Sequence, residues 1–378
     1  MQFNILSRMK LWQKFALLGV LGLAAVAVPY AQFYRTAQEG IDFAATELGG
    51  IAPTQNAARL LQLLQLHRGL SGLTLSGIED QTKARAAKQA EADQAVIALD
   101  QQISQIDAKP VKDEWNAIKQ DWKQLANDVT NRTTDARKSF DSHTAVNTRI
   151  LRLLDVLGDN SFLTLDPTAR TYFLVQAALV HLPLLTEQNG QMRGFGASRL
   201  ADSARLRATG ADGSAAVSAA DRTRMTALAD NATAASDLAY RFLAKAIAAE
   251  PRLRAVLEGE MNLSQEAARQ VLLLARTEIV DTPAPAFDPA KYVQSMTTGI
   301  DHQFKLQALT STALAAELNT YKDSLRRNQL VISAEILAAL LLVAAIAAFT
   351  VRNITGTVSS LQQSVKSPAG RLHGVAGD

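Results

Sequence analysis

Two long apolar runs constrain this chain more than any other feature. Residues 15–33 and 330–351 are predominantly hydrophobic and lie near opposite ends of the 378 residues. A helix rises ~1.5 Å per residue, so ~20 residues cover the ~30 Å of hydrocarbon in a bilayer. We therefore expect two membrane-spanning helices, at 15–34 and 330–351, with the long segment between them held outside the lipid.

The charges beside these runs predict the orientation of the chain. Three basic residues and no acidic residue precede the first run, and residues 352–378 carry three basic residues and one acidic residue. Short cationic flanks favour the cytoplasmic side. Residues 1–14 and 352–378 are thus predicted to be cytoplasmic, and 35–329 to be periplasmic, in a two-pass protein of a bacterial inner membrane.

A cleaved signal peptide is the alternative for the first run. Residues 25–27, Ala-Val-Ala, resemble a small-residue cleavage site. However, the run is longer than the usual apolar core of ~7–15 residues. Tyr30, Phe33 and Tyr34 also resemble an aromatic anchor at a membrane interface. We expect a retained span.

Composition excludes several classes of function. The chain has no cysteine, so it has neither disulfides nor thiolate metal sites. Its net charge is +3, and no basic run interleaved with aromatic residues suggests a nucleic-acid partner. The five histidines include no metal-binding pair at i,i+4, and there is no Gly-rich phosphate loop or nucleophile elbow. We expect no enzyme activity, cofactor or metal.

The segment 35–329 is predicted to be all-α. Helix-forming residues dominate it, and no β-branched alternation is joined to hairpin turns. Proline marks helix starts at Pro110, at Asp166-Pro167 and at Asp288-Pro289, the last of which opens a helix that continues into the second run. We expect an antiparallel bundle of two modules, roughly 35–160 and 161–329.

An arginine-glycine motif occurs once in each expected module. Residues 68–72, Arg-Gly-Leu-Ser-Gly, align with residues 193–197, Arg-Gly-Phe-Gly-Ala. In the first copy the arginine lies on an apolar stripe with 3,4 spacing, made of Leu61, Leu64, Arg68, Ser71 and Leu75. Because a buried arginine keeps its charge, an anion must lie nearby. That anion is either a carboxylate of a neighbouring helix or a ligand.

Residues 60–77, with their Gln-x-x-Arg-Gly-Leu-Ser core, resemble the opening motif of the nitrate- and nitrite-sensing domain. The resemblance implies a sensor of two helical bundles in which arginines of both hold the anion, here Arg68 and Arg193. It further implies an arginine from a later helix, Arg269 or Arg276. His67 either tunes anion binding through its protonation or is an ordinary solvated histidine. The expected ligand is nitrate, nitrite or a short carboxylate.

The overall plan resembles bacterial methyl-accepting chemotaxis receptors. Ile354, Val358, Leu361 and Val365 step by four, three and four, the seam of a parallel coiled coil. This segment looks like the first helix of a HAMP linker, although a plain amphipathic helix remains an alternative. We expect a homodimeric transmembrane sensor. Residues 352–378 are too few for an output domain, so the chain is either a fragment or signals through another chain. The competing hypothesis is a membrane-tethered helical scaffold without a ligand.

Overall fold

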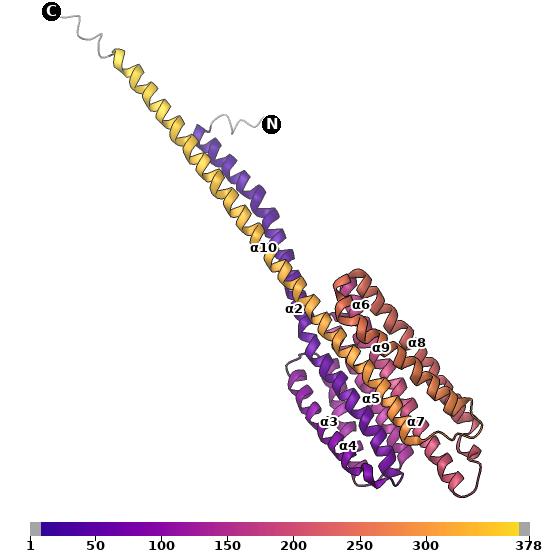
Figure 1. Ribbon diagram of the computed structural model, residues 1–378. Coiled ribbons are helices and arrows are strands. Elements are labelled where there is room, and N and C mark those ends of the chain that lie inside the picture. The colour runs from indigo at the N-terminus through magenta and orange to yellow at the C-terminus, as the bar shows by residue number, and fades with distance from the viewer. Residues whose placement is uncertain (1–8, 370–378) are drawn as a thin grey trace, which may run out of the picture. The chain divides into compact units, whose positions relative to one another are not determined.

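The computed structural model describes residues 9–369, which are helical over most of their length and contain no strand (Figure 1). The predicted all-α fold is confirmed. The chain divides into a terminal unit, Met1–Ile41 with Lys322–Asp378, and a central unit, Asp42–Tyr321. Helices α2 (Leu11–Leu75) and α10 (Pro289–Ala369) contribute residues to both units.

Within the terminal unit, α2 and α10 are long and apolar enough to cross a membrane. Their most apolar windows have mean hydropathies of 1.8 and 2.6, and neither is buried within the protein. The hydroxyls of Tyr30 and Ser333 share a hydrogen bond of 2.7 Å between the two helices. Both helices are thus candidate membrane spans by length and composition.

The first half of the central unit packs around the later part of α2. Its other helices are α3 (Thr82–Ile103), α4 (Lys109–Thr130) and α5 (Ala136–Asn160), with a short 3₁₀ turn, η1 (Glu79–Gln81), before α3. Trp115 and Trp122 lie on one face of α4 and are buried in this core. Their indole N–H groups donate to Asp100 and Asp93 of α3.

The second half has its own hydrophobic core, to which α10 contributes. The α-helices of this half are α6 (Ala169–Val175), α7 (Leu182–Ala208), α8 (Ala219–Ala249) and α9 (Arg254–Ala275). Two π-helical segments, η3 (Gln176–His181) and η6 (Arg276–Val280), follow α6 and α9. Short 3₁₀ turns lie at η2 (Leu163–Leu165), η4 (Ser214–Ala216) and η5 (Pro251–Leu253).

Two of the three predicted helix starts are confirmed. Pro110 lies in the first turn of α4, and α10 begins at Pro289, where Asp288 Oδ1 accepts a hydrogen bond of 2.8 Å from Lys291 N. The start expected at Asp166 is displaced, because α6 begins only at Ala169. Asp166 Oδ1 instead accepts from Thr168 N at 2.7 Å, which forms a turn before the helix.

Candidate functional site

Arg68 of α2 forms a buried ion pair with Glu187 of α7. Its side chain is 1% exposed, and Nη1 lies 2.6 Å from Glu187 Oε1. A second donation, from Nη2 to Glu187 Oε2, is 3.4 Å long. Nη1 also donates to Thr144 Oγ1 of α5 at 3.0 Å. The counter-ion of Arg68 is therefore a carboxylate of the protein, which is one of the two alternatives that the sequence left open.

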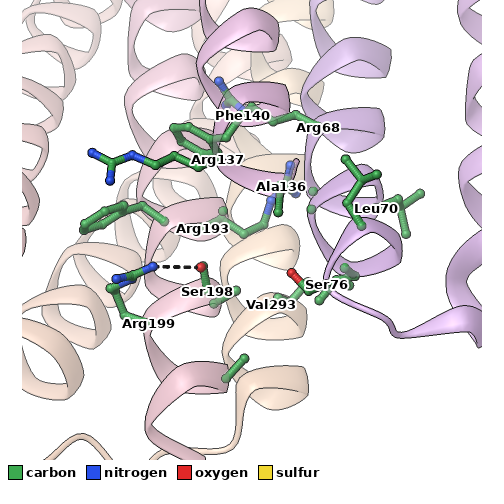
Figure 2. Close-up of a pocket in the computed structure, with 18 of the residues that line it drawn as sticks. Arg68, Leu70, Ser76, Ala136, Arg137, Phe140, Arg193, Ser198, Arg199 and Val293 are labelled. Carbon is green, nitrogen blue, oxygen red and sulfur yellow. Dashed lines mark hydrogen bonds between the residues drawn. The ribbon is translucent and has the colours of Figure 1, made fainter. Parts of the chain in front are cut away.

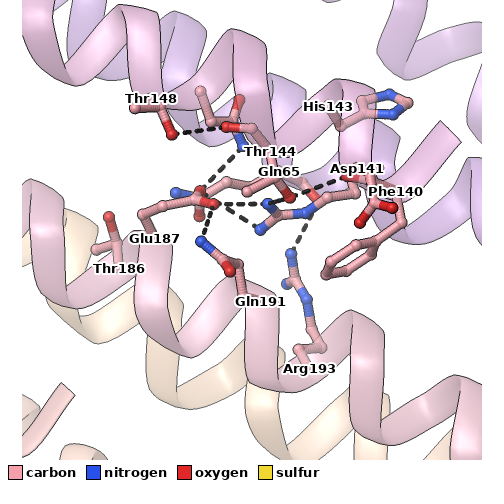
Figure 3. Close-up of polar contacts among 12 residues, drawn as sticks. Gln65, Phe140, Asp141, His143, Thr144, Thr148, Thr186, Glu187, Gln191 and Arg193 are labelled. Carbon is pink, nitrogen blue, oxygen red and sulfur yellow. Dashed lines mark hydrogen bonds and ion pairs between the residues drawn. The ribbon is translucent and has the colours of Figure 1, made fainter. Parts of the chain in front are cut away.

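Glu187 is saturated by donors from three helices (Figure 3). Besides Arg68, it accepts from Asn147 Nδ2 of α5 at 2.9 Å and from Gln191 Nε2 of its own helix at 3.0 Å. Glu187 is thus the carboxylate that pairs with Arg68 in this interior.

Arg193 of α7 is buried without a carboxylate partner. It is 3% exposed, and its guanidinium donates to Thr297 Oγ1 of α10 at 3.0 Å and to the Gln65 carbonyl of α2 at 3.1 Å. Among residues 9–369, no Asp or Glu lies within ion-pair distance of it. Burial and the charge of Arg68 lower the pKa of Arg193 to about 10, so it remains charged at neutral pH.

Glu187 is thus the carboxylate in direct contact with this arginine pair, and Asp301 acts on Arg193 only at longer range, so the positive charge of the site is incompletely compensated. Several buried polar atoms of this site also have no hydrogen-bond partner, including Arg68 Nε, Gln65 Nε2 and Gln65 Oε1. Gly190 allows this close packing of α7 and α2, because a Cβ there would lie 2.9 Å from Arg68 Nη2. Buried polar groups are normally satisfied, so this site is suited to a small anionic ligand.

A cavity of about 660 Å³ opens beside the two arginines (Figure 2). Both Arg68 and Arg193 line it, so the two arginine-glycine motifs meet at one place. Its walls come mainly from α2, α5, α7 and α8, with Val293 and Thr297 from α10. Further basic residues line it: Lys88, Arg137, Arg199, Arg205 and Arg224.

His67 lies next to Arg68 in sequence but is not among the residues that line the cavity. It is fully buried, and its Nδ1 lies 2.8 Å from His143 Nε2. Burial, and then the charge of Arg85, lower the pKa of His67 to about 3. The pKa of His143 is also well below its usual value because of burial. Both rings are therefore neutral near pH 7, and His67 does not titrate there.

Arg269 and Arg276 are not brought to the cavity. The Arg269 side chain is 68% exposed and pairs with Glu266 at 3.7 Å, while Arg276 is 47% exposed and pairs with Asp230 at 2.6 Å. Sequence reasoning also missed Glu187. It is the only acidic residue between 182 and 197, but the sequence alone does not show which arginine it pairs with. No cluster of three or more potential metal ligands occurs in the described part of the chain.

Comparisons with known proteins identify the family of this chain and a structure that shares its fold. The profile of the NIT family, described as nitrate and nitrite sensing, matches residues 59–328. The structure of the NasR transcription antiterminator matches with a TM-score of 0.56 and 19% identity, over 81% of this chain and 78% of that chain, which shows a shared fold. Curated proteins gave no match. Since the profile spans most of the chain and includes Arg68, Glu187 and Arg193, the chain belongs to the nitrate and nitrite sensing family.

Proposed function

We propose that this chain is a membrane-anchored sensor that binds a small planar oxyanion, nitrate or nitrite, between Arg68 and Arg193. The observation that carries the proposal is the incompletely compensated positive charge of this interior, where the hydrogen bonds of the Arg193 guanidinium go to neutral groups. A guanidinium donates paired hydrogen bonds that match planar oxygen pairs. The family membership supports the same class of ligand.

The same helices that hold the arginines offer a route for the signal. Arg68 lies on α2, which also carries the apolar run at 15–34, and Arg193 bonds to Thr297 of α10, which carries the run at 330–351. An anion that draws Arg193 away from Thr297 changes a contact of α10. We expect a shift of ~1–2 Å in these helices, which requires that the anion bind the two arrangements unequally.

In this proposal the chain is an inner-membrane receptor of the chemoreceptor type, with the central unit in the periplasm and both termini in the cytoplasm. A homodimer follows from the seam predicted after the second run. Ile354, Val358 and Leu361 of α10 are exposed in the single chain and thus free to pack against a second copy. Val365 lies outside the residues whose side chains are described.

The test is the thermal stability of the full chain in lipid nanodiscs, in sodium nitrate against sodium chloride at equal ionic strength. At a nitrate concentration a hundredfold above Kd, the wild type should gain ~2.7 kcal/mol of stability. Arg193→Gln should lose this gain, because it removes the incompletely compensated charge. The matched control is Arg276→Gln, which alters a surface ion pair. A nitrate effect that survives in Arg193→Gln contradicts the site, and a wild type without any anion effect supports a scaffold instead.

A further inference from the structure

The cavity beside Arg68 and Arg193 is much larger than a nitrate ion. Its volume is about 660 Å³. A water-sized group takes ~30 Å³, so there is room for on the order of twenty such groups. Nitrate, with four non-hydrogen atoms, fills only a small part of this space. Cavities of ~300–1,000 Å³ are those in which proteins hold organic ligands.

The α2 wall of the cavity is recessed by two glycines. Gly69 and Gly72 line the cavity, and a Cβ at either position would meet no atom within 4 Å. By contrast, a Cβ on Gly194 would lie 2.8 Å from Phe140 Cε2, so that glycine is required by packing. Glycine weakens a helix by ~1 kcal/mol relative to alanine. At Gly69 and Gly72 no packing within the chain offsets that cost.

Part of the wall around this space is apolar. Leu66, Leu70 and Leu73 line it from α2, and Phe140 and Phe195 line it from α5 and α7. In Figure 2, Leu70 lies on the α2 side of the cavity and Phe140 on the opposite side. Such walls favour a ligand with an apolar body.

The charges of the cavity are unevenly compensated. Rim arginines have acidic neighbours, since Arg199 lies 2.9 Å from Asp202 and Arg224 lies 3.7 Å from Asp141. Arg193 has none within ion-pair distance among the described residues. The least compensated of these positive charges is therefore that of Arg193, beside Arg68, and the negative group of a ligand belongs there.

We infer that the cavity binds an organic monocarboxylate with an apolar body of several carbons. The carboxylate occupies the place of the planar anion at Arg193 and Arg68, and the apolar body fills the space over Gly69 and Gly72 and against Phe140. This inference rests on the proposed function, because it uses the same two arginines, and it adds the class of ligand. Each methylene removed from water raises affinity about fourfold, so the body decides which carboxylate binds.

Calorimetry of the full chain in nanodiscs, with nitrate, acetate and benzoate as probes, tests the inference. Benzoate should bind the wild type at least about tenfold more tightly than acetate. Gly72→Leu should weaken benzoate by about tenfold or more and change nitrate by less than about threefold, because it fills space in the cavity and leaves both arginines in place. The matched control is Gly259→Leu, at an exposed helical glycine of α9 whose Cβ also meets no atom within 4 Å. It should behave as the wild type.

Benzoate that binds no better than acetate, or that binds Gly72→Leu as well as the wild type, overturns the inference. If nitrate still binds and Arg193→Gln abolishes that binding, the proposed function stands without it. Failure of every anion to bind the wild type overturns both. If Gly72→Leu does not fold, the test uses the ratio of benzoate affinity to acetate affinity in the wild type. Gly72→Ala, a smaller change at the same position, should lower that ratio.

Discussion

Glu187 is the carboxylate that pairs with Arg68 inside the central unit. Replacing it with glutamine leaves Arg68 and Arg193 buried with no carboxylate of the described residues within ion-pair distance. Breaking a buried ion pair by removing one partner costs ~3–5 kcal/mol, so Glu187→Gln should destabilise the anion-free protein by that amount. Nitrate should restore part of the loss and bind more tightly than in the wild type. Denaturant unfolding with and without nitrate measures both effects.

The control for this experiment is Glu266→Gln, whose carboxylate is 58% exposed in its pair with Arg269. Exposed pairs contribute ~0–1 kcal/mol, so this variant should unfold almost as the wild type does. Equal stability of Glu187→Gln and the wild type would show that the ion pair with Arg68 contributes nothing to the folded state.

Glu47 and Asp166 form a second buried polar contact, between α2 and the turn before α6. They are 1% and 7% exposed, and their carboxyl groups share a hydrogen bond. Burial, together with the charge and the hydrogen bond of Asp166, raises the pKa of Glu47 from 4.5 to about 8. Glu47 therefore holds a proton at neutral pH. With that proton, one carboxyl group donates a hydrogen bond to the other, whereas two carboxylates could only accept.

Because this pKa is raised in the folded state, the proton stabilises the fold fully below about pH 4.5. That stabilisation falls as the pH rises toward the folded pKa of about 8. Glu47→Gln keeps a donor without titrating, so its stability should change less with pH and exceed that of the wild type at alkaline pH by ~1–3 kcal/mol. Thermal unfolding across pH 5 to 9 measures this. Identical pH profiles would contradict the assignment, and Glu258→Gln, on the surface of α9, serves as control.

At this scale the sequence predicted part of the site. The repeated Arg-Gly motif pointed to Arg68 and Arg193, and the structure places both on the wall of one cavity. His67 faces elsewhere, because adjacent residues of a helix point in directions about 100° apart. The role of Glu187 depends on how α7 packs against α2, and no local pattern encodes that contact.

Among the elements, the end of α9 depends on one side chain of α8. Arg222 Nη1 donates to the carbonyls of Ile279, Val280 and Thr282 at 2.7, 2.7 and 2.6 Å. Its Nη2 donates to the Pro283 carbonyl at 3.0 Å. These carbonyls end the π-helical segment η6 and begin the proline-rich linker before α10, so Arg222 satisfies groups that have no partner in a helix end.

Arg222→Lys keeps the charge but loses the planar fork of donors. Hydrogen bonds to charged groups contribute ~1.5–3 kcal/mol, so amide hydrogen exchange in residues 276–284 should accelerate by about tenfold or more. Nitrate affinity should stay within about threefold of the wild type, since the linker does not line the cavity. Unchanged exchange would show that the linker is held by other contacts. Arg254→Lys, in an exposed i,i+4 pair with Glu258, is the matched control.

Two of the three predicted helix starts followed from local chemistry, whereas the π-helical segments were not predicted. Pro110 and Asp288-Pro289 mark starts because proline and an Asp oxygen satisfy a helix terminus without tertiary contacts. In η3, by contrast, the Ala178 carbonyl accepts from Gln307 Nε2 of α10 at 2.9 Å. A donor from a distant helix supplies that bond, so residues 176–181 carry no recognisable signal of their own.

For the whole molecule, the apolar runs and their flanking charges predict which parts of the chain lie on which side of the membrane. The absence of cysteine makes that prediction directly testable, because any introduced thiol is the only one in the chain. Ser104, after α3, and Ser359, in α10 beyond the second run, both have exposed side chains. They differ in their predicted compartment and therefore form a matched pair.

A membrane-impermeant maleimide should label Ser104→Cys in cells whose outer membrane is permeable to it. It should label Ser359→Cys only after the inner membrane is opened. An impermeant maleimide cannot cross the ~30 Å of hydrocarbon, so in such cells it reaches only the periplasmic thiol. Labelling of both thiols in intact cells would contradict the two-span topology, and labelling of Ser359→Cys alone would reverse it. Protection of Ser104→Cys with a folded central unit would place the anion site in the cytoplasm, where it would report an intracellular rather than an external anion.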